Sequence, residues 1–184
     1  GVKEYNFTAK EGTYLYEVGL LDNAAYQIAM GLYGAMVVRP AGTLNQAYAS
    51  PSVVNYDNEA VVLLSEIDPA LNRTATPVGF DMRDYAPKFR LVNGKVSPLT
   101  DVFNALPGES LLLRYVNAGL QPHSMSVLGL RQSEVALDGN AYVHAKNLVA
   151  DTLAPGQTAD MLVTIPGSAT LGSKFALYDG SFSL

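Results

Sequence analysis

Apolar residues in this chain come in short stretches with a period of two, and turn-forming residues separate the stretches. Residues 14–18 alternate in this way, and residues 34–38 form a second β-prone run that stops at Arg39-Pro40. Between them, residues 22–30 are polar at first and then rich in Ala, which predicts about one or two helical turns. No segment sustains a long apolar period of 3.6 residues, so the pattern predicts strands rather than long helices.

Two stretches in the middle of the chain have the pattern of strands that are covered on both faces. Residues 60–64 are continuously apolar. Residues 110–117 carry apolar side chains on both alternating faces, and we expect the charge of Arg114 to lie at the edge of this strand. Residues 41–58 have no periodic apolar pattern, so we interpret them as an irregular linker or crossover.

The rest of the chain repeats strand-length apolar segments and turn signals at regular spacing. Asn93-Gly94 and Asp138-Gly139 tolerate positive φ and therefore mark tight turns. Further strands are expected at residues 89–92, 125–130, 134–137, 147–153, 159–165 and 174–178. This succession predicts an all-β protein, and a Greek-key β-sandwich is the most economical architecture.

The composition excludes several kinds of metal site and partner for this chain. The 184 residues include 0 Cys and 2 His, which excludes disulfides, thiolate-bound zinc and a copper–thiolate electron-transfer centre within this chain. Twelve Lys and Arg against 17 Asp and Glu give a net charge of −5 without a cationic cluster, so we expect no nucleic-acid partner. No apolar run approaches the roughly 20 residues of a membrane-spanning helix, so no membrane span is expected.

Two groups of short phrases follow one another in a distinctive order. The first group comprises Gly12-Thr13-Tyr14-Leu15-Tyr16, Gln27 and the run from Met30 to Pro40. The second group comprises Leu91-Val92-Asn93-Gly94-Lys95, the run from Leu113 to Gly119, Asp138-Gly139, the run from Leu153 to Gln157, and Asp160. The first resembles the end of one domain, and the second the middle of the next, in the multicopper oxidase family, whose chains string cupredoxin domains together. The resemblance implies a cupredoxin-like Greek-key β-sandwich.

The resemblance also implies a division of the chain. Residues 1–40 would be the C-terminal strands of a first cupredoxin domain, residues 41–57 a linker, and residues 58–184 a second cupredoxin-like domain. The start Gly1-Val2-Lys3-Glu4 lacks an initiator Met and the layout of a signal peptide, which indicates a processed, trimmed or excised chain. The partners implied are other cupredoxin domains of a longer protein or another copy of this chain, which would form a homo-oligomer. The alternative is that residues 1–40 complete one enlarged sandwich with the rest.

The family holds copper with His residues at fixed strand positions, and this chain departs from that pattern at two places. The phrase that matches residues 12–16 normally continues with His-x-His, whereas this chain continues with Glu17-Val18-Gly19. Residues 122–129 resemble the copper-binding phrase His-Pro-x-His-x-His-Gly. Ser126 and Leu128 stand there in place of the second and third imidazoles.

The remaining candidates for metal binding are weak. His123 and Met125 belong to the copper-phrase segment, and imidazole and thioether both suit copper. A structural His at a strand start and a core Met are the simpler readings. His144 is expected to be exposed in a loop, and Asp68 and Asp81 stand in contexts where Asp bonds local backbone amides. The sequence therefore assigns no catalytic residue, no cofactor-binding residue and no firm metal ligand.

Two functions from different classes remain open. The chain is interpreted as the copper-free portion of a multicopper oxidase-like oxidoreductase, scaffolding copper-bearing domains, with copper expected elsewhere in the longer protein. The alternative is a non-catalytic β-sandwich module for binding or interaction that has lost copper chemistry. In either case the chain alone is expected to be inactive, and the resemblance implies a periplasmic or secreted location.

Overall fold

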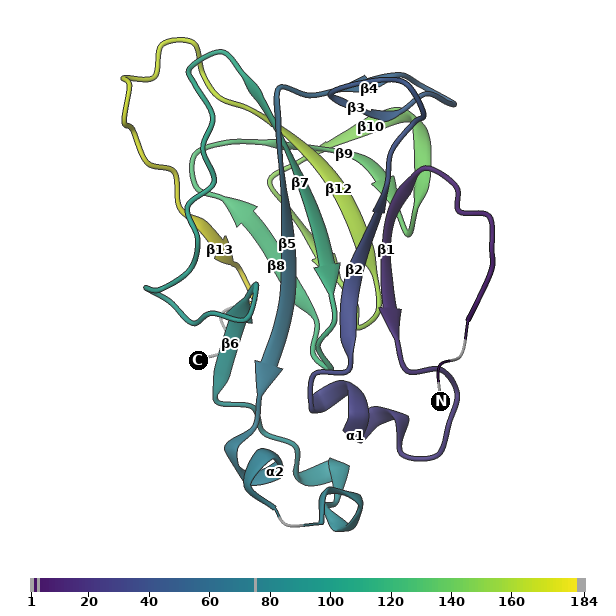
Figure 1. The fold of residues 1–184 in the computed structure, drawn as a ribbon. Helices are drawn as coiled ribbons and strands as arrows, with labels where there is room; N and C mark the ends of the chain where they lie inside the picture. The colour runs from purple at the N-terminus through teal and green to yellow at the C-terminus, as the bar shows by residue number, and fades with distance from the viewer. Residues whose placement is uncertain (1, 3, 75, 182–184) are drawn as a thin grey trace.

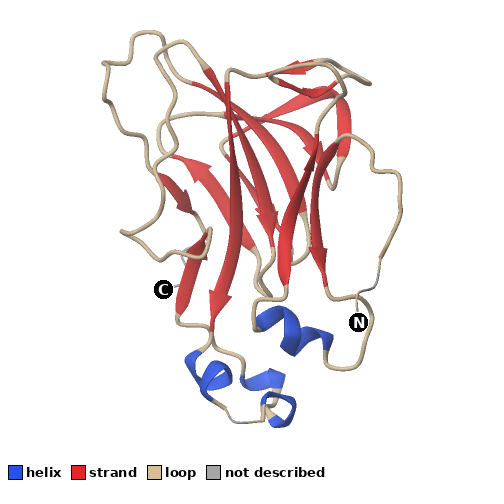
Figure 2. Ribbon diagram, in the orientation of Figure 1, coloured by secondary structure: helices blue, strands red, loops and turns tan. Residues whose placement is uncertain are grey.

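A computed structural model of the chain describes residues 2, 4–74 and 76–181. Residues 1 and 184, the outer limits of the expected division, therefore lie outside the described part, as do residues 3, 75, 182 and 183. Most of the regular secondary structure in these residues is β-strand, and the helices are short and lie at one end (Figure 1, Figure 2). The helices are α1 (Ala24–Ala29), α2 (Pro69–Arg73) and the 3₁₀ turns η1 (Pro77–Gly79) and η2 (Met82–Asp84). The expected short helix is confirmed by α1.

A six-stranded sheet forms the centre of the molecule. Its order is β10 (Asn140–Leu148), β9 (Gln132–Leu137), β12 (Thr158–Thr164), β7 (Ser110–Asn117), β5 (Asn58–Ile67) and β6 (Phe89–Val92). β5 and β7 run parallel, while the other neighbours run antiparallel.

Shorter sheets cover both faces of this central sheet. A three-stranded sheet of β11 (Ala150–Leu153), β8 (His123–Val127) and β13 (Leu177–Asp179) covers the inner face. The hairpin of β1 (Gly12–Glu17) and β2 (Tyr33–Val38) and the short pair of β3 (Gln46–Tyr48) and β4 (Val54–Asn55) lie on the outer face. The all-β Greek-key sandwich predicted from the sequence is confirmed.

Alternation along the central strands separates two apolar clusters. Leu111, Leu113 and Tyr115 of β7 point to the inner face, where they join residues of β5, β8, β11 and β12 in the main core. Leu112 points to the outer face and packs with Tyr48 of β3. The interpretation of residues 41–58 as irregular is wrong in this respect, because β3 and β4 lie there and Tyr48 is buried.

The expected edge position of Arg114 is also wrong. Its side chain is 0% exposed, in the middle of β7 on the outer face of the central sheet. Its Nη1 lies 2.9 Å from Oδ2 of Asp160 on β12, and its Nε donates to Oε2 of Glu59 on β5 at 2.8 Å. Burying a guanidinium is costly unless it is paired and hydrogen-bonded, and these two carboxylates supply that pairing.

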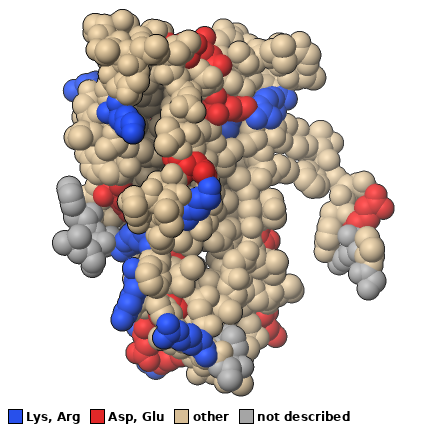
Figure 3. Space-filling view, turned by 60° about the vertical axis from the view of Figure 1, so that its left-hand side comes forward, with Lys and Arg blue, Asp and Glu red and all other residues tan. Residues whose placement is uncertain are grey.

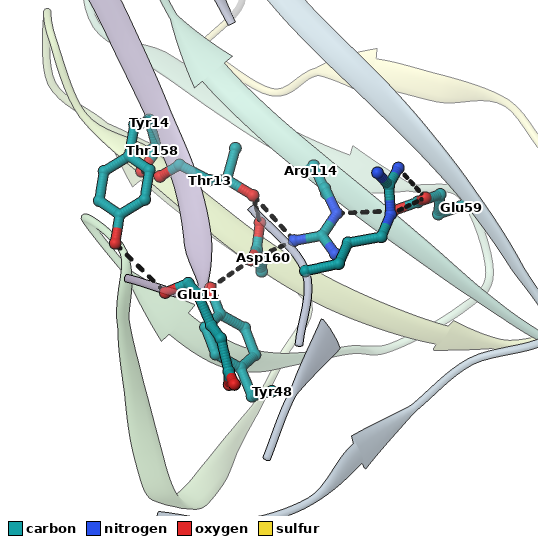
Figure 4. A network of polar contacts seen from close by, with 9 residues as sticks. Glu11, Thr13, Tyr14, Tyr48, Glu59, Arg114, Thr158 and Asp160 are labelled. Carbon is teal, nitrogen blue, oxygen red and sulfur yellow. Dashed lines mark hydrogen bonds and ion pairs between the residues drawn. The ribbon is translucent and has the colours of Figure 1, made fainter. Parts of the chain in front are cut away.

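The same buried group ties the outer layer to the central sheet (Figure 4). Thr13 of β1 donates from Oγ1 to Oδ1 of Asp160 at 2.5 Å and accepts from Nη1 of Arg114 at 3.0 Å. The Tyr48 hydroxyl donates to Oδ2 of Asp160 at 2.5 Å, and Thr158 donates to the Thr13 carbonyl oxygen at 2.7 Å. Strands from both outer pairs therefore meet at one carboxylate.

Opposite effects set the ionisation of the two carboxyl groups. Burial raises the pKa of Asp160, although Arg114 and the hydroxyl donors oppose it. Burial also acts to raise the pKa of Glu59, but hydrogen bonds from Arg114 and Arg39 outweigh it and hold the pKa below its usual value. Asp160 therefore needs the nearby guanidinium of Arg114 to remain ionised where it is buried.

We expect the substitution Arg114→Leu to lower the free energy of unfolding by about 3–5 kcal/mol, because it leaves the buried carboxylate of Asp160 without its cation. Urea denaturation followed by circular dichroism measures this change. Arg83→Leu is the control, since Arg83 pairs with Asp81 in an exposed ion pair and its loss should change stability little. Equal effects of the two substitutions would contradict the role given to Arg114.

Candidate functional site

The segment that resembles the copper-binding phrase forms β8, on the inner side of the sandwich. His123 opens this strand and Met125 follows two residues later, so both side chains lie on one face, and both are buried. His123 is 2% exposed. The structure thus places the two weak metal candidates side by side, next to the main apolar core.

Carboxylates hold both ring nitrogens of His123. Nε2 lies 2.7 Å from Oε1 of Glu66 on β5, and Nδ1 lies 2.7 Å from Oδ2 of Asp179 on β13. Since β8 and β13 belong to the three-stranded sheet and β5 to the central sheet, the imidazole joins the two layers of the sandwich. We call His123, Glu66 and Asp179 the imidazole bridge.

Backbone groups fix the two carboxylates of the imidazole bridge. The amide of Leu120 donates to Oε2 of Glu66 at 3.0 Å. The amide of Ser124 donates to Oδ1 of Asp179 at 2.9 Å. Gly119 lies so close to Glu66 that a Cβ atom there would fall 2.2 Å from Oε1, so the close approach requires Gly. The bridge is therefore positioned by main chain on both sides.

The surroundings favour the charged form of the bridge. Burial acts to lower the pKa of His123, but the hydrogen bonds to Glu66 and Asp179 outweigh it and raise the pKa above its ordinary value. Burial also acts to raise the pKa of Asp179, yet the amides of Ser181 and Ser124 and the ring of His123 hold it below its ordinary value. An imidazolium between two carboxylates satisfies both requirements.

An apolar cleft of about 1080 Å³ lies beside the imidazole bridge. The residues of strands β5 to β8 that line it are mainly aliphatic, among them Leu64, Leu111, Leu113 and Val127. Residues 97, 100–107 and 169–176, which have no regular strand or helix, form its rim. Figure 3 turns this side of the molecule forward and shows scattered charged side chains on a mostly uncharged surface.

The other sequence candidates lie apart from the bridge. Ser126 is buried and donates to the Val149 carbonyl oxygen at 2.8 Å, while Leu128 is exposed. Glu17 is exposed at the end of β1. His144 is exposed as expected, but it lies in strand β10 rather than in a loop.

The acidic candidates bond local backbone, as the sequence indicates. Asp68 accepts from the Ala70 amide at 2.7 Å and caps α2. Asp81 accepts from the Arg83 amide at 2.9 Å and caps η2.

The residues present do not fit a copper centre. Both nitrogens of His123, through which an imidazole would bind copper, face carboxylate oxygens, and no Cys is available anywhere in the chain. Within residues 2, 4–74 and 76–181, no group of three or more His, Cys, Asp or Glu side chains is placed to hold a metal ion. The chemistry that this site supports is hydrogen bonding and apolar contact.

Sequence reasoning missed both partners of His123. They lie 57 and 56 residues away in the chain, so no local motif links them to the imidazole. A usable signal is the period of two in β5, which places Glu66 on the same inward face as Val62 and Leu64. A carboxylate in that position requires a buried partner.

Comparison with solved structures finds copper proteins. The chain superposes on a blue copper oxidase from Nitrosomonas europaea with a TM-score of 0.77 and 16% identity, covering 94% of this chain and 50% of that one. For a copper nitrite reductase from Nitrosomonas europaea the TM-score is 0.76 and the identity 24%, and the match covers 97% of this chain and 60% of that one. For the multicopper oxidase mgLAC the TM-score is 0.74 and the identity 19%, and the match covers 92% of this chain and 49% of that one. Comparison of the sequence with protein-family models and with curated proteins finds no match.

These likenesses establish a cupredoxin-like fold and agree with the resemblance found in the sequence. The chain spans between 49% and 60% of the length of these three solved chains. None of the helices within residues 2, 4–74 and 76–181 has the length and apolar character needed to cross a membrane.

The raised pKa of His123 predicts a pH-dependent effect of replacing it. The contribution of the imidazolium is fully present below the ordinary value of 6.5 and is lost as the pH rises through the raised value. We expect His123→Gln to lower the free energy of unfolding by about 3 kcal/mol in mild acid, and by less as the pH rises.

Urea denaturation of both proteins from about pH 6 to about pH 9 measures this difference. His144→Gln is the matched control, because His144 is exposed and its replacement should show no such trend. A cost for His123→Gln that stays constant or grows with pH would contradict the charged bridge.

Proposed function

We propose that this cupredoxin-like chain is the copper-free portion of a multicopper oxidase-like oxidoreductase. In this role it supports copper-bearing domains of a longer polypeptide. The observation that carries the proposal is the imidazole bridge, because the strand that resembles the copper-binding phrase uses its one His to join the two layers of the sandwich. A scaffold needs that rigidity, whereas a copper site needs free ring nitrogens.

The extent of the fold supports the same proposal. Solved copper proteins of this fold have chains that extend well beyond the part that this chain matches. On this proposal, residues 1–40 belong to the end of a first domain and residues 58–184 to a second domain, with Thr13 and Asp160 at their contact. Copper would then be bound outside these residues, in a periplasmic or secreted protein.

A second function is favoured by the cleft beside the bridge. A sandwich with an apolar cleft of about 1080 Å³ and no copper ligands could serve as a binding or interaction module without redox chemistry. A copper carrier built on His123 and Met125 is the weakest alternative, since both ring nitrogens would have to leave their carboxylates.

Copper titration of the chain separates these functions. We expect no tight, stoichiometric uptake of Cu(I) or Cu(II), measured against a chromophoric chelator and by electron paramagnetic resonance, and no phenol oxidation. His144→Ala should remove any weak surface uptake, because His144 is exposed. Met125→Leu keeps the side-chain volume and should change nothing.

The outcomes point in different directions. Tight binding of one copper that is lost in Met125→Leu would overturn the copper-free proposal and favour the carrier. The scaffold function would be supported if a longer polypeptide containing this chain binds copper and oxidises phenols while the chain alone does neither. Their absence from both would favour the binding module.

A further inference from the structure

The two facing sheets of the sandwich differ in width on the side of the cleft. The central sheet has six strands and ends at β6, while the sheet that covers its inner face has three strands and ends at β13. The cleft is lined by β5, β6 and β7 on one side and by β8 and β13 on the other. The inner face near β5 and β6 is therefore covered by the loops 100–107 and 169–176 instead of by a strand.

The cleft between these sheets reaches the main apolar core. Leu113 of β7 and Met125 of β8 line it, and each is only 2% exposed. The volume of the cleft is about 1080 Å³. This value lies at the upper end of the range of roughly 300–1,000 Å³ that is usual for sites that enclose a drug-sized molecule. Such depth and size suit a small molecule better than the surface of another protein.

Exposed apolar side chains surround the mouth of the cleft. They come from both rim loops, which lie side by side on the left of Figure 1. They are Val102, Leu106, Leu171 and Phe175. Exposed apolar surface that continues into an apolar cavity is typical of a binding site.

The charged groups at the inner end of the cleft are engaged within the chain. His123 and Asp179 line the cleft and bind each other at 2.7 Å in the imidazole bridge. Arg90 also lines the cleft, opposite Glu66 in the register of β5 and β6, and its Nη2 donates to Oε1 of Gln121 at 3.0 Å. With the ring of His123 protonated, the two cations and the two carboxylates of this region balance.

The charged groups at the rim are also engaged or lie in solvent. Asp101 forms an ion pair with Lys95, and Glu109 accepts a hydrogen bond from Nδ2 of Asn58 at 2.8 Å. Lys174 is exposed. A charged ligand would lose its hydration in the apolar cleft, and the charged groups of the lining already have other partners or water. The cleft therefore favours an uncharged molecule.

We propose that the cleft binds one uncharged, apolar small molecule. The aliphatic side chains of β5, β7 and β8 form the walls of the site, and the apolar residues of the two rim loops close over the ligand. The inference rests on the binding function proposed above for the cleft, and it names the class of ligand. It requires no copper, so it holds equally for a chain that supports copper-bearing domains.

Two fluorescent probes with the same ring system test the class of ligand. N-phenyl-naphthylamine is uncharged and apolar, and anilinonaphthalene sulfonate is its sulfonated analogue. Both emit more strongly in apolar surroundings, so fluorescence titration of the chain measures the affinity and stoichiometry of each. We expect one equivalent of N-phenyl-naphthylamine to bind. The sulfonate should bind at least about tenfold more weakly, because its charge would be desolvated without a free counter-charge.

Two substitutions test the location of the site. Ala105→Trp adds volume to the lining from one rim loop, and Leu171→Glu places a charge on the other. Each should weaken binding of N-phenyl-naphthylamine at least about tenfold. Leu171 is 75% exposed, so its replacement should leave the fold intact, and circular dichroism checks both variants. Ala41→Trp and Leu44→Glu are the matched controls, since both residues are exposed and lie outside the cleft lining.

The proposal is supported if the uncharged probe binds with one-to-one stoichiometry, is weakened by both cleft substitutions and is unaffected by both controls. The absence of saturable binding would overturn it and favour a protein partner on the apolar rim. Equal affinity for the two probes would also overturn it, as would binding that persists in both cleft variants. The copper titration has a separate readout, so failure of this inference leaves the copper-free proposal standing.

Discussion

The structure depends on the pairing of charges that the sandwich buries. A guanidinium with no exposed surface lies in the central strand β7, and its position is tolerable only because Asp160 and Glu59 face it. The hydroxyls of Thr13 and Tyr48 complete the hydrogen bonding of Asp160 and belong to the two outer strand pairs. The outer strands β1 and β3 must therefore pack where Thr13 and Tyr48 can reach Asp160, and this fixes their positions.

The inner face follows the same rule with different groups. There, an imidazole rather than a guanidinium is the buried base, and it links β8 to Glu66 of the central sheet and to Asp179 of β13. This use of His123 determines what the cupredoxin-like fold can do in this chain. A ring held by carboxylates at both nitrogens contributes to stability, whereas a copper ligand must present a free nitrogen to the metal. The chain has the cupredoxin-like fold, and the strand that resembles the copper-binding phrase carries a buried His that joins the two layers.

Much of the architecture could be predicted from the sequence, because period-two alternation and turn residues act locally. The strands β5, β7 and β12 are found close to their expected positions, as is α1. Arg114 was misplaced because local alternation does not reveal that a second layer covers the outer face of β7. Tyr48 was missed for a similar reason, since its burial comes from contacts with distant strands and not from any pattern in residues 41–58. The partners of His123 depend on sheet order, which no short motif encodes.

The protonation state of the His123 ring tests the central claim most directly. Nitrogen-15 NMR of the imidazole in mild acid reports how many ring nitrogens carry a proton, and His144 provides an exposed reference in the same spectrum. The account predicts that both nitrogens of His123 are protonated and that one equivalent of Cu(I) leaves their signals unchanged. A neutral ring under these conditions, or a signal that shifts when Cu(I) binds, would contradict it.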